Sequence, residues 1–123
     1  MLNVFECAID ALSYLTQLKM QGQNWRCQSV LSLGGVYQPK RDEPPTMPVA
    51  LKTYLTVHRD VQEIVLRLDN DEVGRGAAQA IRVTIETLTV TIAHPEQGKD
   101  YNEWLMLQKG LSSRQRSRAE RSR

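Results

Sequence analysis

Three acidic residues fall within four positions of the segment LRLDNDEVGRGAAQAI, residues 66–81. Asp69 follows an apolar run, and Asp71 and Glu72 precede a segment rich in Gly and Ala. Two carboxylates one residue apart can hold a divalent cation such as Mg²⁺, which prefers oxygen ligands and keeps several of its waters. Alternatively, Asp71 or Asn70 would cap a helix, with Glu72 favourable in its first turn. Capping does not account for Asp69.

Similar groups follow every segment that we expect to be a strand. They occur at Glu6, at Gly34 and Gly35, at Asp69 and Asp71, and at Lys99 and Asp100. Ligands of open parallel sheets gather at the carboxyl ends of the strands, so we expect these groups to lie near one another. Each has a simpler explanation, as a solvated acid, a turn or a helix cap. In combination they favour a site where a cation or protons offset the repulsion between carboxylates. Such a site suits metal-assisted phosphodiester chemistry or nucleic-acid binding.

Apolar periodicity predicts strands that alternate with helices. The expected strands are 2–6, 28–35, 63–68 and 88–93, and the expected helices are 8–22, 46–58, 72–88 and 101–109. The first helix should bury a face made of Ala8, Ile9, Ala11, Leu12, Tyr14, Leu15 and Leu18. The third should bury Val73, Ala77, Ala80, Ile81 and Thr84. This order predicts an α/β fold with a parallel sheet, right-handed crossovers and helices on both faces.

Composition is that of an ordinary soluble domain. The chain has 123 residues, 41% of them hydrophobic and 24% charged, and no apolar run is long enough to span a bilayer. The first residues, MLNVFECAID, do not resemble a secretory signal, which predicts a cytoplasmic protein with no membrane association. Cys7 and Cys27 lack the spacing of a zinc site, and we expect both to be reduced and packed.

Basic charge is concentrated at the C-terminal end. Residues 111–123 hold five arginines and one glutamate, whereas residues 1–110 hold eleven basic and thirteen acidic side chains. A segment with so few apolar residues predicts disorder. Arg114, Arg116 and Arg118 would contact nucleic-acid phosphates without sequence preference. A merely solvated terminus is the alternative.

Four segments, in this order, resemble the motifs of TOPRIM domains. They are FECAIDALSYL, LSLGG, IVLRLDNDEVGRGAAQAI and GKDYNEWL, and the resemblance extends over residues 2–108. TOPRIM domains occur in type IA and type II topoisomerases, bacterial primases and several nucleases. The segment with Asp10 four residues after Glu6 and the segment with GR after Asp71 are similar to the primase-like branch. The segments FECAIDALSYL and LSLGGVYQPK resemble the corresponding segments of TOPRIM proteins of bacterial plasmids and conjugative elements.

This resemblance implies a Rossmann-like TOPRIM fold, with a four-stranded, mainly parallel sheet, over residues 1–109, followed by a basic tail, 110–123. Glu6 would act as general acid or base or share in metal binding, and Asp69 and Asp71 would bind Mg²⁺, or Mn²⁺ in its place. Supporting residues would be Asp10, Gly34, Gly35, Gly74, Arg75, Lys99 and Asp100. One departure from the primase pattern is Cys7, which stands where a glycine follows the glutamate.

Two functions follow from the resemblance. The chain would be a Mg²⁺-dependent nucleotidyltransferase or nuclease acting on DNA or RNA, in the DNA processing of a mobile element. Alternatively, it would be a non-catalytic, metal-dependent module that binds nucleic acid or a partner protein, or a fragment of a longer protein. The chain has no zinc-binding module of a primase and no topoisomerase tyrosine domain, so we expect it to need additional domains or partners. The oligomeric state is open.

Overall fold

The computed structural model describes residues 1–110, and within them four strands form one parallel sheet. The strands are β1 (Leu2–Phe5), β2 (Ser29–Ser32), β3 (Glu63–Leu66) and β4 (Thr89–Ile92). Their order in the sheet is β2-β1-β3-β4, and Val4 of β1 pairs with Leu31 on one side and Leu66 on the other. The predicted α/β fold with a parallel sheet is confirmed.

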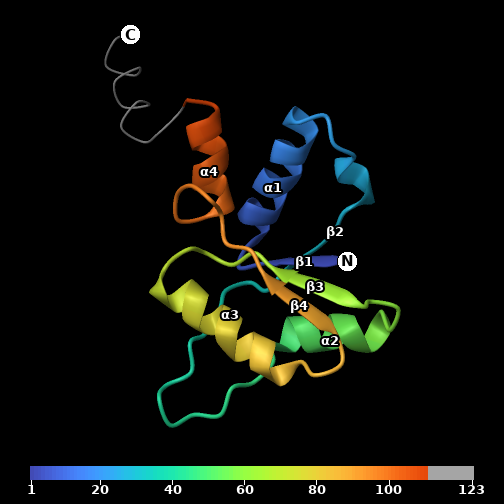
Figure 1. Ribbon diagram of the computed structural model, residues 1–123, viewed down its shortest axis with the longest axis vertical. Helices are drawn as coiled ribbons and strands as arrows, with labels where there is room; N and C mark the ends of the chain where they lie inside the picture. Colours follow the sequence, from blue (N-terminus) through green and yellow to red (C-terminus); the bar gives the residue numbers. More distant parts are fainter. Residues whose placement is uncertain (111–123) are drawn as a thin grey trace.

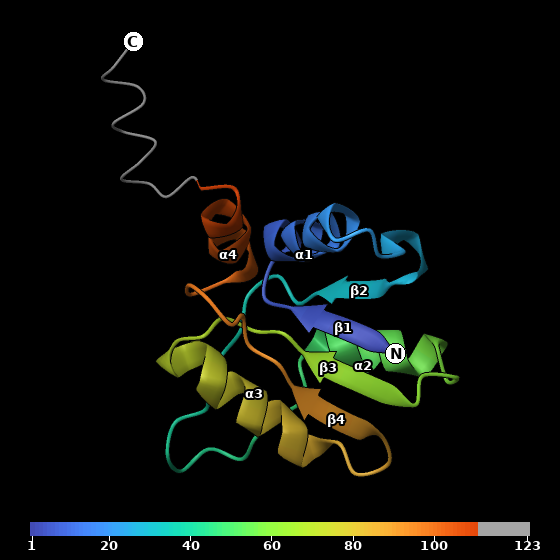
Figure 2. The ribbon, with the colours of Figure 1, turned by 45° about the horizontal axis from the view of Figure 1, so that its top comes forward.

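Helices cover both faces of the sheet. They are α1 (Ala8–Met20), α2 (Val49–Val57), α3 (Glu72–Thr84) and α4 (Tyr101–Gln108), with a short 3₁₀ helix, η1 (Trp25–Cys27), before β2. Figure 1 shows α1 and α4 side by side on one face, and α2 and α3 on the other. Figure 2 shows the same two layers from a second direction.

β1 is buried at all four positions, which are apolar except for Asn3. The Asn3 side chain is hydrogen-bonded, because its Nδ2 donates to the Ser29 carbonyl and its Oδ1 accepts from Arg67 Nε. Leu2 and Val4 are fully buried against α2 and α3 in a core with Leu51, Ile64, Leu66, Leu68, Ala77, Ala78 and Ile81. Phe5 alternates to the other face, where it packs with Tyr101 and Tyr14 under α1 and α4. A central strand covered on both faces needs apolar residues at successive positions rather than at every second one.

The predicted buried face of α1 is partly wrong. Ile9 and Leu12 are 58% and 62% exposed, and the helix buries Asp10 and Ser13 instead. Both polar side chains find partners at the start of α4: Ser13 Oγ lies 3.2 Å from Asn102 Oδ1, and Asp10 Oδ1 accepts a hydrogen bond from the Asn102 backbone N–H at 3.2 Å. Hydrogen bonding to α4 therefore determines which face of α1 turns inward.

Helix α3 also departs from its prediction. It ends at Thr84 rather than near Leu88, and Ile85 is already extended. Val73 is 48% exposed and does not belong to the buried stripe, and Ala80 and Thr84 are half-buried. The stripe consists of Gly74, Ala77, Ala78 and Ile81. The β-branched residues at the end of this helix disfavour its continuation, because they lose side-chain freedom in a helix.

Both cysteines are free thiols within the described residues. Cys7 is half-buried, but Cys27 is exposed, so the prediction that both are packed is wrong for Cys27. Its sulfur accepts a hydrogen bond from Asn24 Nδ2 at 3.0 Å on the surface. No helix within residues 1–110 is long and apolar enough to cross a membrane.

Candidate functional site

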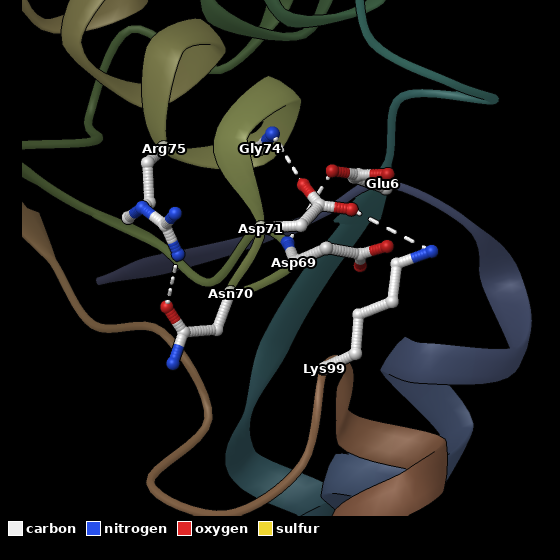
Figure 3. Close-up of polar contacts among 7 residues, drawn as sticks. All are labelled: Glu6, Asp69, Asn70, Asp71, Gly74, Arg75 and Lys99. Atoms are coloured by element: carbon white, nitrogen blue, oxygen red, sulfur yellow. Dashed lines mark hydrogen bonds and ion pairs between the residues drawn. The ribbon is translucent and has the colours of Figure 1, made fainter.

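The carboxyl ends of β1 and β3 bring two acids together. The strands are neighbours in the sheet, Glu6 follows β1 directly, and Asp69 follows β3 by three residues. Glu6 Oε1 accepts a hydrogen bond from the backbone N–H of Asp69 at 3.3 Å. Figure 3 shows the side chains of Glu6, Asp69 and Asp71 gathered in one place, with Lys99 reaching toward them. The chain therefore places these acids, which are far apart in sequence, at one rim of the sheet.

The Glu6–Asp69 pair carries more negative charge than its surroundings compensate. Burial, followed by the nearby charges of Glu6, Asp10 and Asp100, raises the pKa of Asp69 to about 7. Burial also raises the pKa of Glu6, against the hydrogen bonds from Asp69, which lower it. Crowded carboxylates retain a proton for this reason. Asp69 therefore keeps its proton to a higher pH than an ordinary aspartate does.

Asp71 has structural partners of its own. Its Oδ1 accepts a hydrogen bond from the Gly74 N–H at 2.7 Å and so caps α3, and its Oδ2 lies 3.5 Å from Lys99 Nζ. The charge of Asp71 raises the pKa of Lys99. The capping explanation is therefore right for Asp71, and the same carboxylate still faces the acidic site. Capping leaves Asp69 and Glu6 unexplained.

The donor set suits a hydrated Mg²⁺. Within residues 1–110, no three acidic, histidine or cysteine side chains are arranged to hold a metal ion together. Mg²⁺ keeps several waters and needs only one or two carboxylates, which Glu6 and Asp69 supply. A cation there would offset the repulsion between the acids that raises the pKa of Asp69. The roles of Glu6, Asp69 and Asp71 in metal binding stay predictions.

Asp10 and Asp100 support the loops around the site. Asp10 is buried at the start of α1, where its Oδ2 accepts a hydrogen bond from Cys7 Sγ at 2.9 Å and its Oδ1 binds the N-terminus of α4. Asp100 caps α4, because its Oδ1 accepts from the Glu103 N–H at 2.8 Å. Both charges act on Asp69 from these positions. A sequence-based explanation of Lys99–Asp100 as a helix cap is thus right for Asp100.

The predicted glycines shape the backbone around the acids. Gly34 and Gly35 have φ of 70° and 115°, which L side chains rarely adopt, and the Gly35 N–H donates to the Glu6 carbonyl at 2.7 Å. A Cβ on Gly74 would collide with the backbone carbonyl of Asp69. These glycines therefore allow the turn after β2 and the start of α3 to approach the acid-bearing strand ends.

Arg75 does not point at the acids. Its Nη1 donates to Asn70 Oδ1 at 3.0 Å, and Figure 3 shows this pair on the side of the site away from Lys99. Arg114, Arg116 and Arg118, which we expect to contact phosphates, lie outside the described residues.

Two connections that hold the site are not indicated by any motif in the sequence. The Asn70 N–H donates to the Lys99 carbonyl at 2.6 Å and joins the loop after β3 to the loop before α4. Asn102 joins α4 to Asp10 and Ser13 of α1. Asn102 belongs to the segment GKDYNEWL, but no periodic pattern in the sequence indicates its contacts with Ser13 and Asp10, which lie 89 and 92 positions earlier.

The parallel sheet, with helices on both faces and acids at the carboxyl ends of neighbouring strands, belongs to the class of open α/β folds that bind ligands at this edge. A family model described as Toprim-like matches residues 3–105, and the chain belongs to this family. Toprim domains are generally modules that bind divalent metal, typically Mg²⁺, and act on nucleic acids. No curated protein and no solved structure matches the chain.

Proposed function

We propose that the chain makes or breaks nucleic-acid phosphodiester bonds with Mg²⁺, by primase-like nucleotidyl transfer or by nuclease-type hydrolysis. The observation that carries the proposal is the Glu6–Asp69 pair at the sheet edge. A hydrogen bond holds the two residues together, and burial and the neighbouring acids raise the pKa of Asp69 to about 7. Membership in the Toprim-like family supports it. We further propose the primase-like branch and a role in the DNA processing of mobile elements, because of the motifs around Glu6 and Asp71.

Each acid has a role that its position allows. Asp69 and Glu6 would hold the cation directly, and Asp71, at the helix cap, would face it through one of the waters that Mg²⁺ keeps. A bound Mg²⁺ supplies neutralisation of phosphate charge and polarises the attacking water or hydroxyl. Glu6, whose pKa is raised by burial, would accept the proton that the nucleophile loses. Lys99, already paired with Asp71, would face the phosphate as a second positive charge.

A non-catalytic binding module is the second candidate. Residues 1–110 carry eleven basic and thirteen acidic side chains, so this part of the chain has no excess positive charge with which to attract nucleic acid. We therefore propose residues 1–109 as the metal-binding domain, and residues 110–123, with Arg114, Arg116 and Arg118, as a basic segment that contacts phosphates. Affinity for nucleic acid would come from this segment and from other domains or partner proteins.

A titration with Mg²⁺, followed residue by residue by NMR, tests the metal site before a substrate is known. We expect resonances of Glu6, Asp69 and Asp71 to shift at millimolar Mg²⁺, and the shifts to be lost in Asp69→Asn. Glu72→Gln is the matched control, because Glu72 is an exposed acid in the first turn of α3 and should leave the shifts intact. Equal responses from both variants would contradict the site.

Activity distinguishes the two candidates. We expect cleavage of single-stranded DNA, or primer synthesis on it, with Mg²⁺ in the unmodified protein and in Glu72→Gln, and loss of activity in Asp71→Ala. If Mg²⁺ binds but the unmodified protein neither cleaves nor synthesises, the non-catalytic candidate replaces the enzymatic one.

A further inference from the structure

A cavity of about 390 Å³ lies beside the acidic site, on the α3 side of the sheet. One wall of the cavity comes from the loop after β2 and the other from α3. The loop contributes Gly34, Gly35, Val36, Tyr37, Pro39, Thr46 and Pro48, and the helix contributes Ala77, Ala80 and Ile81. Figures 1 and 2 both show the long loop between β2 and α2 running alongside α3, and this loop and the helix form the opposite walls. The volume is within the usual range for small-molecule sites.

The lining suits a flat, uncharged ring rather than an anion. Within the described chain, none of the residues that line the cavity is charged. Ala77 and Ile81 are almost fully buried, so their methyl groups provide an apolar floor. Polar groups are present at the edge, which includes the exposed Thr46 side chain and the exposed backbone of Gly34 and Gly35. A phosphate would find no cation there, whereas a heterocycle would find both apolar faces and polar edges.

Two backbone connections place this cavity next to the acids. The N–H of Gly35, in one wall, donates directly to the carbonyl of Glu6 at 2.7 Å. Ala77, in the other wall, lies one turn of α3, about 4.5 Å along the axis, after Gly74. The Gly74 N–H binds the Asp71 carboxylate. A ligand with its ring in the cavity would therefore carry its other end toward the acidic rim.

We infer that the cavity is the base-binding subsite for a nucleotide whose phosphate is handled by the acidic site. This inference rests on the proposed function, because the acidic site supplies the reason for a phosphate to lie beside the ring. The polar edge consists of carbonyl and hydroxyl groups, which accept hydrogen bonds from the amino and imino groups of a base. The apolar floor gives no preference between purine and pyrimidine.

The probes are adenosine and cytidine, titrated separately into the full chain without metal and followed by NMR. We expect shifts of Gly34, Gly35, Ala77 and Ala80 that saturate with at least one nucleoside. Ala80→Leu should abolish them, because the larger side chain fills the cavity from α3. Gln79→Leu is the matched control: it adds the same side chain at the neighbouring, exposed position of the same helix and should leave the shifts unchanged.

A second filling variant, Thr46→Leu, acts from the loop wall and does not depend on the packing of α3. It should also abolish the nucleoside shifts. With Mg²⁺ present, adenosine monophosphate should bind at least tenfold more tightly than adenosine, and Asp69→Asn should remove this difference while it leaves adenosine binding intact.

The outcomes separate the inference from the proposed function. Nucleoside shifts that are absent, that map elsewhere, or that persist in both filling variants would overturn the base-binding subsite, even if Mg²⁺ binds at Asp69. Nucleoside binding in the cavity without any Mg²⁺ response would support the subsite and refute the metal site. A peptide with an aromatic side chain that competes better than either nucleoside would show that the cavity serves a protein partner, and would also overturn the inference.

Discussion

Gly74 is the residue at which the start of α3 meets the strand end that carries Asp69. It is buried, and a Cβ there would lie 2.9 Å from the carbonyl carbon of Asp69 and closer still to its oxygen. Both atoms belong to the backbone, so neither can rotate away. In Gly74→Ala, α3 and the Asp69 loop must therefore separate.

The size of the effect follows from two opposing contributions. Replacing Gly by Ala inside a helix contributes up to about 1 kcal/mol of stability. Overpacking against a well-packed neighbour costs about 1–3 kcal/mol. We expect Gly74→Ala to lose about 1–2 kcal/mol. Gly76→Ala, two residues along the same helix, is the matched control, because its Cβ would meet only the flexible side chain of Gln38. That variant should be as stable as the original protein or up to about 1 kcal/mol more stable.

Urea denaturation of the two variants measures this difference directly. We expect Gly74→Ala to unfold at lower urea than Gly76→Ala, with the same slope. We also expect Gly74→Ala to respond more weakly to Mg²⁺, because Asp69 and Asp71 move apart. Equal midpoints would refute the close packing of α3 against Asp69, since both variants make the same change in helix propensity.

Three further predictions concern the charges of the site. Because the folded state holds the Asp69 proton more tightly than the unfolded chain, stability without metal should fall by about 1–2 kcal/mol as the pH rises from 3.8 to about 7, after allowance for solvent screening. Urea midpoints across this range test the fall, which Asp69→Asn should flatten. Lys99→Gln should leave the urea midpoint nearly unchanged, since the Lys99 side chain is exposed, and should strengthen Mg²⁺ binding measured by calorimetry, because it removes a competing cation. Asp10→Asn should cost about 1–3 kcal/mol in a thermal melt, because it weakens the buried acceptor of the Asn102 N–H; an unchanged melting temperature would contradict this contact.

The fold was predictable because its strands are short, apolar and separated by helical periodicity. β3 is covered on both faces, so Ile64, Val65 and Leu66 form a continuous apolar run that indicates a parallel sheet. Parallel strands place their carboxyl ends at one edge, which is why Glu6 and Asp69 could be expected to meet.

The orientation of α1 was not predictable in the same way. Its apolar residues favour one face, yet Ile9 and Leu12 lie outside while Asp10 and Ser13 lie inside. The contact that decides this joins Asp10 to Asn102, 92 positions away. A pattern read along one helix contains no information about a polar partner on another.

The acids at the rim are best explained by function because folding alone does not favour them. Asp71 stabilises α3 as its cap and pairs with Lys99, so a purely structural role suffices for it. Within residues 1–110, neither Glu6 nor Asp69 forms an ion pair of this kind. Burial raises the pKa of both groups, and the charge of Glu6 adds to the rise at Asp69. A buried carboxyl pair of this kind costs stability unless a proton or cation binds it. A ligand that binds the folded state but not the unfolded chain stabilises the folded state. Mg²⁺ should therefore raise the melting temperature. This rise should be lost in Asp69→Asn but retained in Glu72→Gln.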